Sequence, residues 1–181
     1  GALQSFCSYR ADIRGIAHDD DLDAFRQAYE EEIACVKAAG KKIRFLYMIP
    51  DFQNPSGESL TLEERRMLVE LAQKHDFLIV EDSPYRELRY EGEHIPTMYS
   101  LDHDRVIHLG SFSKIFAPGF RLGWAIAHPD ILDKIYVCKQ SLDLCPPIFD
   151  QYVAAEFLKS GRLDANLQKS IALYRRKRDL L

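Results

Sequence analysis

A lysine and an arginine flank a Pro-Gly reversal in the segment from Ser111 to Trp124. Lys114 lies in a turn of small residues, and Arg121 follows the reversal. A lysine amine can condense with a carbonyl to form a Schiff base. The hydroxyls of Ser111 and Ser113 and the forked guanidinium of Arg121 can hold a dianion. Together these groups suit an aldehyde cofactor with a phosphate tail, and pyridoxal phosphate has both features.

Three residues upstream add further groups that could act on such a cofactor. Asn54 begins the sequence Asn-Pro-Ser-Gly, Asp82 ends a mostly apolar run that starts at Phe77, and Tyr85 follows Asp82 at the third position. Each has an ordinary structural alternative: Asn before Pro opens turns, Asp caps helices, and tyrosine packs in cores. Their order in the chain is therefore more informative than any one of them.

The motif series Asn-Pro-x-Gly, Asp-x-x-Tyr and Ser-x-Ser-Lys followed by Arg resembles that of the fold-type I aminotransferases of class I and II. The intervals between Asn54, Asp82 and Lys114 are similar to those of the family, and the resemblance covers nearly the whole chain. It implies pyridoxal-phosphate-dependent transamination between an α-amino acid and a 2-oxo acid by a ping-pong sequence. It also implies a homodimer.

The resemblance implies a catalytic role for Lys114, Asp82 and Tyr85. Lys114 would hold the cofactor aldehyde and then, once released by the substrate amine, act as general base and acid. Asp82 would keep the pyridine nitrogen protonated, so that the ring withdraws electrons from the substrate carbanion. Strand alternation turns the preceding Glu81 to the opposite face, where a structural role is expected.

Other positions are implied to bind the cofactor. Asn54 and Tyr85 would hydrogen-bond its 3′-oxygen and lower the pKa of the Schiff base. Ser111, Ser113 and Arg121 would form the phosphate cup. The alternative for Ser113 is that its hydroxyl only hydrogen-bonds the backbone of its own tight turn.

The segment from Glu81 to Tyr90 resembles the aminoadipate and aromatic aminotransferase branch of the family. A related branch, in which a similar domain is fused to a DNA-binding winged helix, usually has the tyrosine one place earlier. A ligand-sensing domain of such a transcription regulator is one alternative function. A fold-type I carbon–sulfur lyase is another, because it would share every residue named above.

Apolar periodicity predicts strand, helix and strand in that order, which is a βαβ unit with a parallel sheet. The resemblance implies the rest of the α/β fold: three αβα layers around a mostly parallel sheet with one antiparallel strand, incomplete in this chain. A helix of period three to four runs from Leu22 to Gly40, where it covers a sheet, and Thr61-Leu-Glu-Glu is a capping box for a second helix. Strands buried on both faces are expected over 43–49 and 77–80, with others over 106–109 and 122–127. Prolines 129, 146 and 147 begin the last helices, which break near Gly161. Parallel strands place Asn54, Asp82 and Lys114 at one carboxyl edge of the sheet, and an antiparallel last strand returns Arg121 to it.

The chain is expected to be the central part of a large domain, because the family's upstream and downstream segments have no equivalent in it. Residues 1–145 would form the partial cofactor-binding domain, and 146–181 would lead toward a small domain. The loose alternation from Cys7 to Ile16 predicts a strand, and the resemblance implies that this strand has no partner in the central sheet. The resemblance also implies unpaired sheet edges, which invite association or disorder, and a cofactor cup that lacks one wall. We therefore expect weak cofactor binding and no transamination by the chain alone.

Composition excludes several other classes. The chain of 181 residues has 46% hydrophobic and 29% charged residues and a formal charge of −4, which is typical of a globular protein without a nucleic-acid footprint. Its sequence has no apolar run of the ~18 residues that a membrane span needs. Four scattered cysteines predict free, buried thiols in a reducing cytoplasm, and the histidine spacing predicts no metal site.

Overall fold

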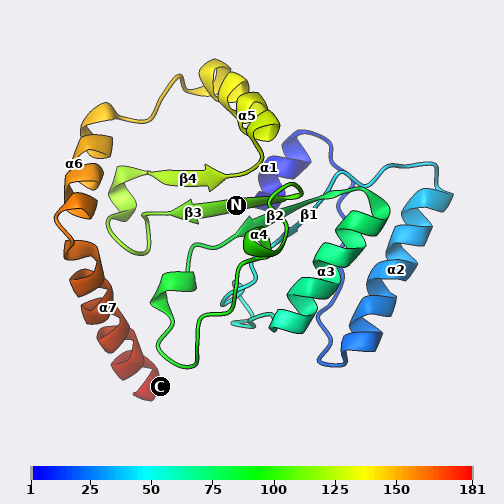
Figure 1. The fold of residues 1–181 in the computed structure, drawn as a ribbon, viewed down its shortest axis with the longest axis horizontal. Coiled ribbons are helices and arrows are strands. Elements are labelled where there is room, and N and C mark those ends of the chain that lie inside the picture. The colour runs from blue at the N-terminus through cyan, green and yellow to red at the C-terminus, as the bar shows by residue number, and fades with distance from the viewer. Residues whose placement is uncertain (1, 181) are drawn as a thin grey trace. The chain divides into compact units, whose positions relative to one another are not determined.

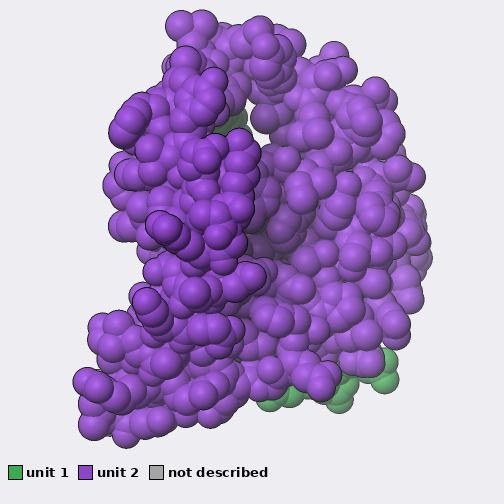
Figure 2. Space-filling model, turned by 60° about the vertical axis from the view of Figure 1, so that its left-hand side comes forward, with its two compact units in different colours: residues 1–44 green, residues 45–181 purple. Residues whose placement is uncertain are grey.

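The computed structural model describes residues 2–180. The chain divides into two compact units, residues 1–44 and residues 45–181, which are coloured separately in Figure 2. All the predicted site residues lie in the second unit. The predicted boundary between residues 145 and 146 stays a prediction.

The first unit contains α1 (Ala2–Ser8) and α2 (Leu22–Ala38). The Asp21 side chain caps α2 by accepting hydrogen bonds from the backbone N–H groups of Asp23 and Ala24. Phe25, Tyr29 and Ile33 are buried along one stripe of α2, as the spacing of apolar residues predicts.

The strand predicted over Cys7–Ile16 is wrong. The segment begins in α1, and residues 11–19 have no regular secondary structure. Its charged side chains form ion pairs: Asp12 lies 2.6 Å from Lys41 and 3.3 Å from Arg14. Loose alternation without strand pairing does not make a strand, because the backbone groups of a strand need partners on a neighbouring strand. The segment takes part in none of the sheet pairings, as expected.

The second unit is built on a mixed sheet in the order β1-β2-β3-β4 (Figure 1). Its strands are β1 (Phe45–Met48), β2 (Leu78–Asp82), β3 (Val106–Ser111) and β4 (Gly123–Ile126). The first three are parallel to one another, and β4 is antiparallel to β3. The mostly parallel sheet with one antiparallel strand is therefore confirmed.

Helices lie on both faces of this sheet. α3 (Leu62–His75) and α4 (Met98–Leu101) contact β2 and β3, and the Met98 N–H donates to Glu81, which identifies the face they cover. Ile107 points to the opposite face, where it lines a groove with α5 (Pro129–Leu142). The unit therefore has the predicted helix–sheet–helix layers.

The capping box predicted at the start of α3 is present. The Thr61 hydroxyl accepts from the Glu64 N–H, and the Glu64 carboxylate accepts from the Thr61 N–H. α3 is buried over most of its length and, with Ile79, Met98 and Val106, forms the core of the unit.

The two outer strands are more exposed than predicted. β1 was expected to be buried on both faces, but Phe45 is 38% exposed, because within residues 2–180 β1 pairs with β2 alone. On the other edge, Trp124 and Ile126 of β4 are also exposed. Both edges of the sheet are unpaired within residues 2–180.

α6 (Ile148–Lys159) and α7 (Arg162–Asp179) follow, separated by Gly161 at a positive φ of 68°. The basic cluster on α7 contacts the loop near residue 90: Arg178 pairs with Glu91, and Arg175 donates to the Tyr90 carbonyl. The prediction of buried thiols is wrong, because all four cysteines are exposed on helices or loops. Across residues 2–180, no helix is both long and apolar enough to span a membrane.

Candidate active site

The predicted site residues gather at one edge of the sheet. Asp82 and Ser111 end β2 and β3, and Asn54 lies in the loop that follows β1. β4 runs antiparallel, and its pairing of Gly123 with Ser111 returns the nearby Arg121 to the edge at which β3 ends. The carboxyl edge of parallel strands is where open α/β sheets bind ligands.

The side chains of Asn54, Tyr85 and Lys114, which belong to three separate motifs, lie close together. The Asn54 amide donates to the Tyr85 hydroxyl over 3.4 Å, which is a long hydrogen bond. The Lys114 Nζ lies 5.9 Å from the centre of the Tyr85 ring. Tyr85 is half-buried, whereas Asn54 and Lys114 are exposed. A basic amine, an amide and a phenol therefore face the same space.

Lys114 projects from a tight turn whose neighbouring residues anchor it. The backbone N–H groups of Phe116 and Ala117 both donate to the Phe112 carbonyl, at 2.9 and 3.1 Å. Ile115, directly after the lysine, is buried. The turn thus fixes the backbone and leaves the amine accessible.

The three residues of the predicted phosphate cup, Ser111, Ser113 and Arg121, lie at this edge, and no hydrogen bond joins one of their side chains to another within the described residues. The Ser111 hydroxyl accepts from the Ser113 N–H at 3.1 Å, so this serine supports its own turn and keeps its O–H available as a donor. Arg121 has a left-handed backbone with φ of 54°, and its guanidinium donates to the Pro118 carbonyl at 3.3 Å. Within residues 2–180, no hydrogen bond joins Arg121 to either serine.

Asp82 is held by a tyrosine on the neighbouring strand. The Tyr47 hydroxyl donates to Asp82 Oδ2 at 2.7 Å. Tyr47 pairs with Val80, so alternation places it on the same face of the sheet as Asp82. Burial, and then the Asp82 carboxylate as acceptor, raise the pKa of Tyr47. The phenol therefore stays protonated and continues to donate at neutral pH.

Glu81 faces away from this site, as strand alternation predicts. Its fully buried carboxylate accepts from the N–H groups of Met98 and Tyr99 and lies 3.0 Å from Nδ1 of His108. These contacts join β2 to α4 and to the neighbouring strand β3. Adjacent acidic residues at the end of β2 therefore have different environments, one inside the core and one at the edge.

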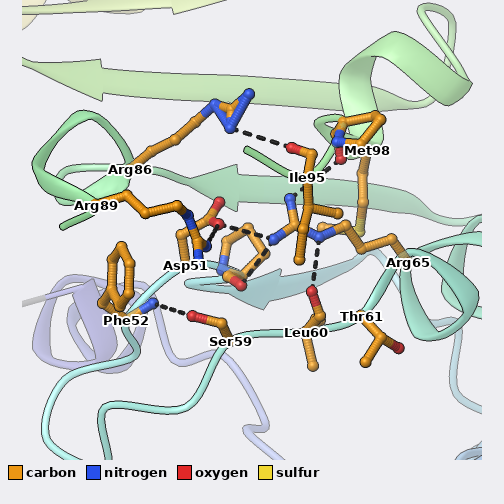
Figure 3. Close-up of polar contacts among 12 residues, drawn as sticks. Asp51, Phe52, Ser59, Leu60, Thr61, Arg65, Arg86, Arg89, Ile95 and Met98 are labelled. Carbon is orange, nitrogen blue, oxygen red and sulfur yellow. Dashed lines mark hydrogen bonds and ion pairs between the residues drawn. The ribbon is translucent and has the colours of Figure 1, made fainter. Parts of the chain in front are cut away.

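A buried charge cluster fixes the loop that carries Asn54 (Figure 3). Asp51 Oδ1 accepts from both Arg65 and Arg89 at 2.9 Å, and the side chains of Asp51 and Arg65 are completely buried. Arg65, on α3, also donates to three backbone carbonyls, those of Pro50, Leu60 and Pro96. Since Pro50 and Leu60 lie at the two ends of the Asn54 loop, a single guanidinium ties both ends together.

Arg89 extends this cluster toward Tyr85. Its guanidinium lies 4.6 Å from the centre of the Phe52 ring in the Asn54 loop. It belongs to the segment that leaves Tyr85 through the 3₁₀ turn η1 (Arg86–Leu88), where Arg86 donates to the Ile95 carbonyl. The Asp51–Arg89 ion pair therefore connects the segment of Asn54 to the segment of Tyr85.

Tyr47 and the cluster of Asp51, Arg65 and Arg89 were not identified from the sequence. Tyr47 was included only as part of an apolar strand. Arg65 had a detectable signal: it precedes the buried Leu68 and Val69 by three and four positions, on the apolar face of a helix. A cation at such a position needs a buried counterion.

The groups at this edge fit pyridoxal phosphate. Asp82 offers a carboxylate with one oxygen already held, Asn54 and Tyr85 are close enough to share one ligand oxygen, and Lys114 offers an exposed amine. Serine hydroxyls and a guanidinium are suitable partners for a phosphate. The described residues contain no cluster of His, Cys, Asp or Glu that could hold a metal ion.

Fold and site together define an α/β protein with a candidate cofactor site at the carboxyl edge of its sheet. The sequence model of the family "Aminotransferase class I and II" matches residues 8–181. The chain belongs to this family.

Two similar proteins agree with the expected branch. The chain is 42% identical to aromatic-amino-acid aminotransferase 1 of Thermococcus litoralis over 99% of its length. It also superimposes with a TM-score of 0.91, at 40% identity over 98% of its length, on a Pyrococcus horikoshii kynurenine aminotransferase in complex with PMP and with kynurenine as substrate. It spans 43% of the first protein and 44% of the second.

A protein of another class is also similar. Over 77% of its length, the chain is 32% identical to the HTH-type transcriptional regulator NorG of Staphylococcus aureus, of which it covers 32%. The aromatic aminotransferase is more similar, both in identity and in coverage.

Proposed function

We propose that this chain forms the central part of the cofactor-binding domain of a pyridoxal-phosphate-dependent aminotransferase, which transfers an amino group between an α-amino acid and a 2-oxo acid. The observation that carries the proposal is the exposed Lys114 amine beside the Asn54–Tyr85 pair, at the same sheet edge as Asp82. When bound, pyridoxal phosphate supplies an aldehyde for amines and an electron-withdrawing ring.

The residues nearest the reaction would have separate tasks. Lys114 would hold the cofactor and, when released, move a proton to or from the α-carbon of the substrate. Asp82 would pair with the protonated ring nitrogen. Asn54 and Tyr85 would donate to the ring oxygen, and their mutual hydrogen bond already holds them together.

Ser111, Ser113 and Arg121 would bind the phosphate. The free O–H of Ser111 and the exposed guanidinium of Arg121 are donors that an anion can recruit without breaking a buried contact. The weak tie of Arg121 to the Pro118 carbonyl would be exchanged for a charge-assisted pair.

The relatives' names suggest which substrates to test first. Names that include aromatic amino acids and kynurenine favour an amino donor with an aromatic side chain. We also propose a homodimer, on the basis of the family resemblance.

The test is Lys114→Ala in the full-length gene product. It should abolish both the visible absorbance of bound pyridoxal phosphate and transamination, because no other amine occupies this turn. Lys169→Ala, which removes an exposed lysine from α7, is the matched control and should retain both. An active Lys114→Ala protein would exclude the proposed role.

Two alternative functions predict different results in assays of the full-length product. Similarity to NorG makes a ligand-sensing domain of a transcription regulator the second candidate; sequence-specific DNA binding by the full-length product, together with no turnover, would favour it. A carbon–sulfur lyase would release ammonia and a 2-oxo acid, whereas an aminotransferase leaves the amino group on the cofactor until a second oxo acid arrives.

A further inference from the structure

The contact between Tyr47 and Asp82 joins a residue outside the family motifs to one inside them. At 2.7 Å it is shorter than the Asn54–Tyr85 hydrogen bond of 3.4 Å. Within residues 2–180 it is the one hydrogen bond to the Asp82 carboxylate, and it engages Oδ2 alone.

This hydrogen bond is not needed to join the two strands. β1 and β2 already pair along their backbones from Phe45 with Leu78 to Met48 with Glu81. A phenylalanine at position 47 would keep the ring and its packing. The hydroxyl therefore adds a hydrogen bond that holds one oxygen of Asp82.

We infer that Tyr47 is a positioning residue that orients the Asp82 carboxylate for the pyridine nitrogen of the cofactor. The inference rests on the proposed function. By occupying Oδ2, the phenol restricts rotation of the carboxylate and leaves Oδ1 as the oxygen available to a ring N–H.

A neutral donor suits this task better than a cation. Lysine or arginine at position 47 would pair with Asp82 and compete with the pyridinium for its charge. A phenol donates a hydrogen bond while the carboxylate keeps its full negative charge. Because burial and the carboxylate raise the pKa of Tyr47, this donor persists over the neutral pH range.

Tyr47→Phe in the full-length gene product tests the inference through two ligands. Equilibrium dissociation constants are measured for pyridoxal phosphate and for the analogue in which C–H replaces the ring nitrogen. Loss of one orienting hydrogen bond should weaken binding of pyridoxal phosphate about three- to tenfold. The analogue has no ring N–H for Asp82, so its affinity should change less than about twofold, since no orienting bond remains to be lost.

Two further proteins serve as controls. Tyr136→Phe removes a hydroxyl from an exposed tyrosine on α5 and should leave both affinities unchanged. In an Asp82→Asn background, Tyr47→Phe should have no additional effect on pyridoxal phosphate, because Tyr47 acts through that carboxylate. A general loss of folding would lower the affinities for both ligands, so the difference between them separates positioning from stability.

An equal loss for both ligands, or no loss for either, would overturn the inference. So would a full effect of Tyr47→Phe in the Asp82→Asn background. These outcomes leave the proposed function intact as long as the unmodified protein binds pyridoxal phosphate through Lys114. Failure of the unmodified protein to bind it would overturn both.

Discussion

The two sides of the candidate site are held by different kinds of contact. On the Asn54 side, which carries Asn54, Asp82 and Tyr85, the supporting contacts involve buried charges: Asp51 binds two arginines, and Arg65 has no exposed side-chain surface. On the Lys114 side, the turn from Ser111 to Arg121 is held mainly by apolar packing and neutral hydrogen bonds, and its one charged contact is the exposed Arg121 guanidinium on the Pro118 carbonyl.

The contacts on the Lys114 side come mainly from the last two helices. The Phe116 ring stacks on Phe157 of α6 with 4.3 Å between ring centres. Asn166 of α7 donates to the Ile115 carbonyl at 3.0 Å. None of these groups carries a charge.

The difference has a consequence for function. A buried ion pair tolerates few alternative geometries, because each charge loses its water and needs its partner. Groups that recognise a rigid ring benefit from such fixed positions. A lysine that must first hold a ligand and then release it benefits from an accessible side chain on a turn with adaptable support.

Arg65→Met should have the largest effect on stability. It leaves Asp51 with one of its two arginines and removes the donor to three carbonyls. Breaking a buried ion pair costs about 3–5 kcal/mol in the free energy of unfolding. Chemical denaturation of the full-length gene product measures this loss. Arg66→Met, one position along α3 and exposed, is the matched control and should change it by less than about 0.5 kcal/mol. Equal losses for the two variants would remove the distinction between the sides.

Gly110→Ala should perturb the Lys114 side by an intermediate amount. A Cβ at this position would lie 2.1 Å from ring atoms of Trp124 on the paired strand β4, so the indole must move. Overpacking of this kind costs about 1–3 kcal/mol. Trp124 fluorescence should shift together with the loss of stability. An unchanged emission spectrum with wild-type stability would show that the close approach is not present in solution.

Asn166→Ala should have the smallest effect. It removes one neutral hydrogen bond to the Ile115 carbonyl, which is worth about 0.5–1.5 kcal/mol. Binding of pyridoxal phosphate should weaken while the Asn54 side keeps its protection in amide hydrogen exchange. Protection lost equally near Asn54 and near Lys114 would indicate that the two sides are a single cooperative element.

The sequence was sufficient for features that depend on local rules. Apolar periodicity and the caps at Asp21 and Thr61 located α2 and α3. Strand ends placed Asn54, Asp82 and Lys114 at one edge, because parallel strands share their carboxyl ends.

Features that depend on tertiary partners could not be predicted in this way. The exposure of Phe45 follows from the position of β1 at one edge of the sheet that residues 2–180 form. The irregular segment after α1 forms ion pairs with Lys41 and Glu32, which are distant in the sequence. Likewise, Tyr47 acquires its importance from a carboxylate 35 positions away.

Covalent trapping tests the central claim most directly. The full-length gene product is incubated with pyridoxal phosphate, reduced with borohydride and digested, and the modified peptide is identified by mass spectrometry. We predict that the phosphopyridoxyl group is found on Lys114, in the peptide that contains Ser113 and Ile115. Modification of a different lysine, or of none, would contradict the proposed site.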